Sequence, residues 1–211
     1  MEFTGFPDAA LDFYEDLEMD NSKSFWLAHK AQYDEAVAVP MKALCAALAD
    51  EFGMAKVFRP YRDVRFSKDK TPYKTHQGAY VAVAPATGWY VQISAAGLRT
   101  GGGFYEATPT RLAALRQAID NEHSGTELEQ LVARYVDAGW LLGGEQVRTA
   151  PRGYDKEHPR IALLRHKTLT LGRDHGFDGL DSPAVLDWVR RDWRDLRPFI
   201  DYLTRPDVLS Q

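Results

Sequence analysis

The stretch GAYVAVAPATGWYVQISAAGLRTGGGFYEATP, residues 78–109, decides the fold class of this chain. Its β-branched and aromatic residues alternate with small or polar ones, and turn-forming pairs stand at Thr87-Gly88 and Ala96-Gly97. This pattern predicts an antiparallel meander of three strands, over residues 79–84, 89–94 and 98–105. The glycine run GGG at 101–103 predicts a bulge, or a close approach of another backbone, in the third strand.

Helical patterns precede the meander. Residues 6–21 carry apolar side chains every three or four positions, and a longer pattern of the same period runs from Ser22 to Gly53. Ser22 is a suitable N-cap, and Gly53 is a suitable terminator. Pro40 cannot donate a backbone hydrogen bond, so it predicts a kink or a restart within the longer helix.

Further helices follow the meander. Thr108-Pro109 predicts the start of one helix, and residues 126–140 form a second amphipathic pattern. The segment KTLTLG at 167–172 predicts another strand, and Ser182-Pro183 predicts the start of a final helix. The fold class expected is therefore α+β, with a mainly antiparallel sheet (the meander) flanked by amphipathic helices at both termini.

Size and composition indicate an ordinary globular protein. The 211 residues are 45% hydrophobic, which predicts a single α+β domain over residues 1–211. A single cysteine, Cys45, excludes an internal disulfide and a cysteine-based zinc finger. The histidines show no H-E-x-x-H spacing, and no P-loop or dinucleotide-binding motif occurs, so we expect neither a metal site nor a cofactor.

The same composition bears on location. The first residues contain no basic segment followed by an apolar run, and no stretch approaches ~18 consecutive apolar residues. We therefore expect a cytoplasmic protein that does not engage a membrane. The sequence does not indicate an oligomeric state.

The stretch RPYRDVRFSKDKTPYKTH, residues 59–76, concentrates positive charge in an acidic protein. From Lys56 to His76 there are seven Lys or Arg and two Asp, a local charge of +5 in a chain of net charge −4. Alternation over residues 61–66 predicts a strand, and Pro72 predicts that the following residues leave it as a loop. Arginine forks suit phosphate or carboxylate groups, so this segment is the candidate anion-binding site.

The candidate ligand-binding residues come from this segment and from a second basic group near Tyr154. The second group would join the first only if the fold brought the two together. Otherwise the second group is a solvated face. The first segment has a similar alternative, in which its arginines pair with acids on helices and its lysines are simply solvated. The candidates are Arg62, Asp63, Arg65, Ser67, Lys68, Lys70, Tyr73, Lys74, Arg152 and Lys167.

The segment FRPYRDVRFSKDKTPYKTH closely resembles the signature of domain-of-unknown-function family 2461, a group of uncharacterised, mostly microbial proteins. The N-terminal segment at 3–35, the glycine-marked strand and helix at 90–119, and PRGYDKEHPRIALLRHKTL at 151–169 are similar to further parts of that family. The resemblance covers most of residues 3–171. Because the family name carries no activity, the resemblance strengthens the location of the site and implies no mechanism.

Three functions remain open on these residues. The leading hypothesis is binding of a phosphorylated or carboxylated small molecule at 59–76, with no catalytic residue assigned. The second is nucleic-acid binding with Phe66 or Tyr73 stacking on bases, against which the sequence pI of about 5.9 weighs. The third is a non-enzymatic structural or partner-binding role. Ser67 and Lys70 formally match S-x-x-K, but Pro72 disfavours the helix that this chemistry needs, and its companion motifs do not occur.

Overall fold

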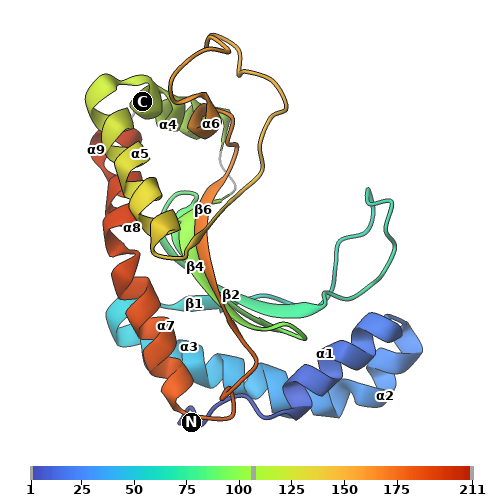
Figure 1. Ribbon diagram of the computed structural model, residues 1–211. Helices are drawn as coiled ribbons and strands as arrows, with labels where there is room; N and C mark the ends of the chain where they lie inside the picture. Colours follow the sequence, from blue (N-terminus) through green and yellow to red (C-terminus); the bar gives the residue numbers. More distant parts are fainter. Residues whose placement is uncertain (1, 106–107, 210–211) are drawn as a thin grey trace. The chain divides into compact units, whose positions relative to one another are not determined.

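The computed structural model of this chain describes residues 2–105 and 108–209 (Figure 1). In chain order the elements are α1 (Ala9–Met19), α2 (Lys23–Tyr33), the π-helical turn η1 (Asp34–Ala38), α3 (Val39–Phe52), β1 (Ala55–Val57), β2 (His76–Ala84), β3 (Thr87–Ser94), β4 (Gly97–Phe104), α4 (Pro109–Asp120), α5 (Glu122–Asp137), β5 (Leu141–Gly143), α6 (Ile161–Leu164), β6 (Leu169–Gly176), α7 (Ala184–Asp195), α8 (Arg197–Thr204) and α9 (Pro206–Leu209).

The strands form one antiparallel sheet in the order β1-β2-β3-β4-β6-β5. The predicted meander is confirmed as β2, β3 and β4, and the α+β class is confirmed with it. The glycine run in β4 lies against the backbone of β6, since a Cβ at Gly101 would lie 2.6 Å from the carbonyl oxygen of Leu171. Gly103 has φ +151° and meets the Leu169 carbonyl in the same way, so the predicted close backbone approach is also confirmed.

The described chain divides into two compact units. Unit 1 comprises residues 1–81, 90–100 and 174–191, and unit 2 comprises residues 82–89, 101–173 and 192–211. Strands β2, β3, β4 and β6 each have residues in both units. This division does not test whether residues 1–211 form a single domain, so that expectation stays a prediction.

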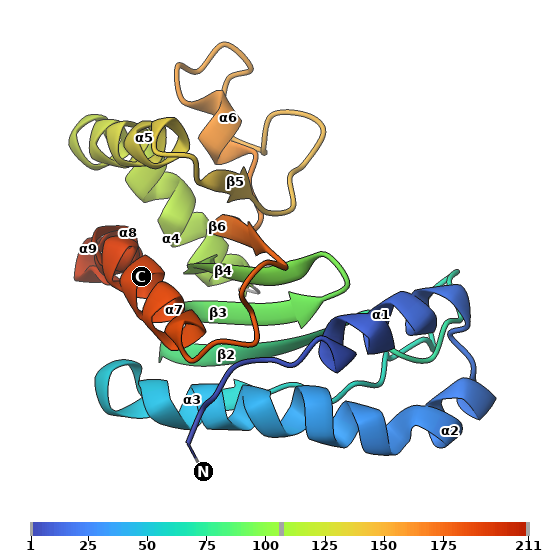
Figure 2. The same cartoon turned by 60° about the horizontal axis from the view of Figure 1, so that its bottom comes forward.

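Unit 1 contains the N-terminal helices. Figure 2 shows α2 and α3 as parts of one continuous helical run. Pro40 is near the start of α3, directly after the π-helical turn, so the interruption expected there takes the form of a wider turn. As expected, the Ser22 hydroxyl caps α2 by accepting from the Phe25 amide at 3.1 Å, and Gly53 follows α3 with φ +96°.

Unit 2 contains α4, α5, α6, α8 and α9. Thr108 caps α4 as expected, with its hydroxyl accepting from the Arg111 amide at 3.2 Å. The side chain of Arg111 is buried and donates to the carbonyl oxygens of Pro85 (3.1 Å) and Leu203 (3.3 Å). The final helix begins near Ser182 but is divided into α7 and α8, because Pro198 cannot donate a hydrogen bond back into α7.

No helix within the described ranges 2–105 and 108–209 is both long enough and apolar enough to cross a membrane.

Candidate functional site

The basic segment forms a loop of unit 1 between β1 and β2. The strand predicted over residues 61–66 is wrong, because the segment makes one isolated antiparallel bridge, between Tyr61 and Tyr73. Two backbone bonds flank that bridge: the Arg62 amide donates to the Pro72 carbonyl at 2.9 Å, and the Lys74 amide donates to the carbonyl before Tyr61 at 2.8 Å. The prolines supply only carbonyl oxygens, so the ladder cannot extend. We call residues 58–61 and 73–76 the stem, and residues 62–72 the tip.

Aromatic packing fixes the stem to α2. The ring of Tyr73 is 5% exposed and stacks on Trp26, with the centroids 4.3 Å apart and an interplanar angle of 8°. The side chain of Asn21 holds both backbone groups of Tyr73, donating to its carbonyl at 3.0 Å and accepting from its amide at 3.1 Å. Burial raises the pKa of the Tyr73 phenol. Tyr73, predicted to bind a ligand, is therefore placed mainly in packing.

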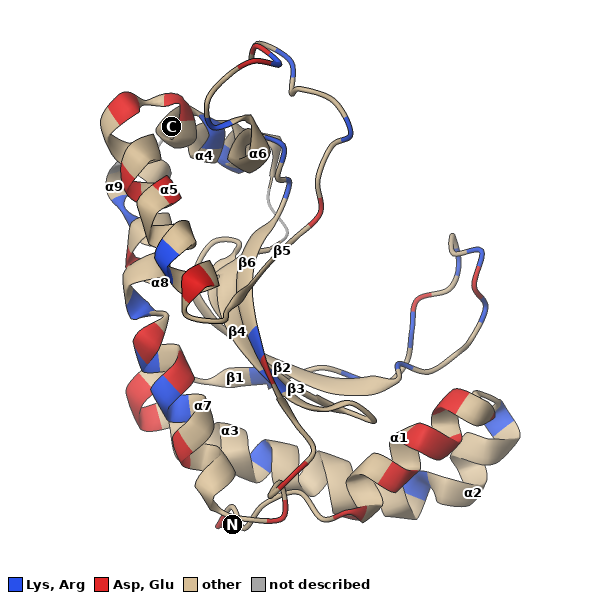
Figure 3. Ribbon diagram, in the orientation of Figure 1, with Lys and Arg blue, Asp and Glu red and all other residues tan. Residues whose placement is uncertain are grey.

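Four charged residues of the tip pair with one another, and Figure 3 shows basic and acidic segments alternating along this loop. Arg62 forms an ion pair with Asp69. Arg65 donates two hydrogen bonds to the carboxylate of Asp63, from Nε at 2.9 Å and from Nη2 at 2.6 Å. Lys70 donates to the Val64 carbonyl at 2.9 Å. The alternative in which acids on helices pair with these arginines is wrong in its partners, because the acids come from the loop itself.

The carboxylates of the tip are correspondingly stabilised in their charged form. The pKa of Asp69 is lowered to about 2, first by the backbone amide of Thr71 and then by Arg62. Hydrogen bonds from Arg65 lower the pKa of Asp63. Groups of the loop itself therefore stabilise the charge of both tip carboxylates.

The cations at the stem and at the adjoining strand β1 have no such partners. The ammonium group of Lys74 lies 5.2 Å from the ring centroid of Phe58, and that of Lys56 lies 6.0 Å from the same ring. Within the described part of the chain, no carboxylate lies at ion-pair distance from Lys56, Arg59 or Lys74. We call Lys56, Arg59 and Lys74 the stem cations.

Electrostatics at the stem therefore differ from those at the tip. Burial lowers the pKa of Lys74, and the nearby charge of Arg59 lowers it further. Burial also lowers the pKa of the half-buried His76, and the charge of Lys74 lowers it further. Positive groups that disfavour one another's charge would be stabilised by an anion placed among them.

Four predicted residues remain, two in the tip of the loop and two in unit 2. Ser67 is half-buried, and its amide donates to the Val64 carbonyl in a turn at 3.3 Å. Lys68 is exposed at the tip. Lys167 pairs with Glu145 at 2.8 Å, and Arg152 is exposed. Both of these basic residues belong to unit 2, so their joining the loop in one pocket stays a prediction.

Sequence reasoning counted Lys56 and Arg59 in the local charge but did not place them in the site. Their importance depends on which cations find an acid, and this is decided by the path of the loop. One pair was visible in the sequence: Asp63 and Arg65 are two residues apart in an extended segment, which places them on the same face.

Comparison with known proteins gives one match. A family model described as conserved hypothetical protein (DUF2461) matches residues 9–202, a span that includes the whole loop. No curated protein and no solved structure matches the chain. The family description names no activity, so any functional inference depends on the geometry of the site.

Proposed function

We propose that this chain, which belongs to the DUF2461 family of conserved hypothetical proteins, binds a phosphorylated or carboxylated small molecule at the stem of its basic loop. One observation carries the proposal: Lys56 and Lys74 lie over the ring of Phe58, the charge of Arg59 is near Lys74, and none of the three has a described acid partner. Guanidinium and ammonium groups in such an arrangement attract an anion and donate hydrogen bonds to it.

In this proposal the two parts of the loop have different tasks. Arg62, Arg65 and Lys70 are engaged within the tip and hold its shape. Lys74 and Arg59 contact the anion, and the half-buried ring of Phe58 lies beside it. Three uncompensated charges favour a phosphate group, which carries about −1.5 to −2 charges at neutral pH, over a single carboxylate.

The test measures binding of inorganic phosphate, adenosine monophosphate and citrate, by calorimetry and by thermal shift at low salt. A ligand specific to the native state stabilises it by about 2.7 kcal/mol at a hundredfold excess over its Kd. We expect Arg59→Gln and Lys74→Gln each to weaken binding about tenfold, the loss of one charge-assisted hydrogen bond.

The matched control is Lys68→Gln, which removes one positive charge from the same loop at an exposed position. It should leave the Kd almost unchanged. Equal weakening by all three variants would mean diffuse attraction by the loop, and the proposal of a stem site would be abandoned.

A second candidate function is binding of single-stranded nucleic acid, favoured by Phe66. This side chain is 96% exposed at the tip, and the guanidinium of Arg65 lies 5.9 Å from its ring centroid. An exposed ring beside cations can stack on a base, a contact that contributes about 1–3 kcal/mol. Phe66→Ala should then weaken binding of a short oligonucleotide, and the affinity should fall with salt at a log–log slope of about −0.7 per phosphate contact. Affinity that is flat in salt, or unaffected by Phe66→Ala, rejects this candidate.

A further inference from the structure

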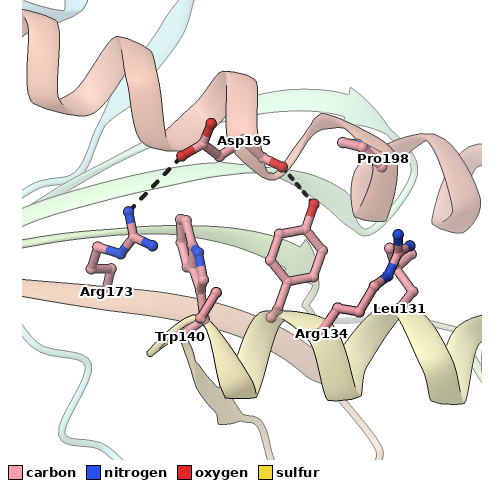
Figure 4. A pocket seen from close by; sticks show the side chains of 8 residues that line it. Leu131, Arg134, Trp140, Arg173, Asp195 and Pro198 are labelled. Carbon is pink, nitrogen blue, oxygen red and sulfur yellow. Dashed lines mark hydrogen bonds and ion pairs between the residues drawn. The ribbon is translucent and has the colours of Figure 1, made fainter.

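We propose that unit 2 carries a second binding site, independent of the loop, which takes a small organic monocarboxylate with an apolar body. The site is a pocket of about 310 Å³ between the C-terminal part of α5, the residue Trp140 that follows it, β6, and the junction of α7 with α8 (Figure 4). Its walls are formed by Leu131, Arg134, Tyr135, Ala138, Trp140, Arg173, Asp195 and Pro198.

One wall of the pocket is held rigidly. The guanidinium of Arg173 lies 4.2 Å from the ring centroid of Trp140, a side chain only 3% exposed. Arg173 also pairs with Asp192 at 2.8 Å and with Asp195 at 4.0 Å, and the carboxylate of Asp192 is almost fully buried. The charge of Arg173 is therefore already compensated.

A second side of the pocket is also bonded to Asp195. The hydroxyl of Tyr135 donates to the backbone carbonyl of Asp195, and Figure 4 shows this bond and the Arg173–Asp195 pair on neighbouring sides of the pocket. The end of α7 is thus linked to β6 by an ion pair and to α5 by a hydrogen bond. A site held in this way loses little conformational freedom when a ligand binds.

Arg134 is the second cation of the pocket lining, and it differs from Arg173 in its partners. It is exposed, it lies beside Leu131 and near Pro198 in Figure 4, and no carboxylate among the described residues is within ion-pair distance of it. Because Arg173 already pairs with Asp192 and Asp195, Arg134 is the cation of this lining that an anion can reach without breaking an ion pair. A guanidinium in this position can bind a carboxylate through two parallel hydrogen bonds.

The rest of the lining defines the ligand's body and its charge. Leu131, Ala138 and Pro198, with the ring of Tyr135, offer apolar surface next to Arg134. The volume is at the lower end of the range of about 300–1,000 Å³ found for ligand pockets, which favours a small molecule. A second negative charge on the ligand would meet the carboxylate of Asp195, so a monoanion fits this pocket better than a phosphate dianion.

The experiment titrates the full chain with benzoate, phenylacetate and isovalerate by calorimetry, with phenylacetamide as the uncharged counterpart of phenylacetate. We expect at least one acid to bind with a Kd below about 1 mM. Arg134→Gln should weaken that binding about tenfold or more, and the amide should bind correspondingly worse than the acid. Arg134 is exposed and glutamine is a good helix former, so this variant should fold.

Two further variants sharpen the result. Arg152→Gln removes the same charge from an exposed arginine of the same unit and should leave the Kd unchanged. Ala138→Phe fills the pocket without changing its charge and should abolish binding. Lys74→Gln, in unit 1, should not affect carboxylate binding here, so failure of the loop proposal and failure of this one are distinguishable.

Several outcomes would overturn the proposal. They are the absence of binding by all three acids at about 1 mM, equal effects of Arg134→Gln and Arg152→Gln, equal affinity for acid and amide, and undiminished binding by Ala138→Phe.

Discussion

Asp69 and Lys74 lie in the same loop, and the pKa of each is lowered, yet the two shifts mean opposite things. For Asp69 the lowering reflects hydrogen bonds that stabilise the charged carboxylate. For Lys74 it reflects burial and the charge of Arg59, which destabilise the charged ammonium. At the residue scale the loop thus contains charges that are satisfied beside charges that are not. The sequence could show that both kinds were present, but not which was which, because the sorting depends on the path of the backbone.

The first prediction concerns acid stability. The pKa of Asp69 falls from 3.8 to about 2 on folding, so its contribution is fully present above the unfolded value. That contribution is lost as the pH falls from about 4 through about 2. Asp69→Asn should remove this part of the pH dependence, measured as the free energy of unfolding in urea between these two values. An identical pH profile in wild type and variant would show that the pairs with Arg62 and Thr71 do not form in solution.

The second prediction concerns Lys74 without ligand. Since folding disfavours its charged form, Lys74→Gln should leave the protein as stable as wild type or slightly more stable, by at most about 0.5 kcal/mol. The same variant should lose phosphate affinity, so stability and binding would change in opposite directions. The measurement is the Tm of both proteins with and without phosphate. A clear loss of stability in the unliganded variant would assign Lys74 a structural role instead.

At the scale of elements, the accuracy of the sequence predictions follows how local each signal is. The meander was predictable because alternation and turn chemistry are both written within residues 78–105. The supposed strand at 61–66 shows similar alternation but lacks a partner, since the ladder around Tyr61 and Tyr73 ends at prolines on both sides. Alternation alone therefore identifies an extended segment, and a second segment with free amides is needed to make it a strand.

The third prediction concerns the anchor of the loop. Tyr73→Ala removes the ring that stacks on Trp26, and truncation of a buried aromatic costs about 3–5 kcal/mol. We expect a loss near the lower end of that range in urea unfolding, together with faster proteolysis within residues 58–75. Phe66→Ala, at an exposed position of the same loop, is the control and should change the free energy of unfolding by less than about 0.5 kcal/mol. Similar costs for the two variants would contradict the anchoring role.

At the scale of the whole molecule, composition and pattern were sufficient for the α+β class, but they did not indicate the grouping into two units. That grouping depends on contacts between residues far apart in sequence, and neither unit is continuous in the chain. The pocket of unit 2 was missed for the same reason. Arg134, Arg173 and Asp195 are widely separated in the sequence, and none stands in a recognisable motif.

The fourth prediction is cooperative unfolding. Because β2, β3, β4 and β6 have residues in both units, one unit cannot lose these strands without disrupting strands of the other. Native-state hydrogen exchange should give the same free energy of opening for the most protected amides of α3 and of α5. Amides at the tip of the loop should exchange much faster and serve as an internal control. Opening of α5 while α3 stays protected would show that the units unfold separately.

The alternation of the two units along the chain also limits how the gene can be altered. Six segments belong in turn to unit 1 and unit 2, so no single truncation yields either unit as a continuous polypeptide. A truncated chain that ends at residue 81, for example, would lack the parts of unit 1 formed by residues 90–100 and 174–191. A truncation that passes residue 81 from the N-terminus, or residue 192 from the C-terminus, therefore removes parts of both units, and forms shortened to that extent should fail as a whole rather than as separable modules.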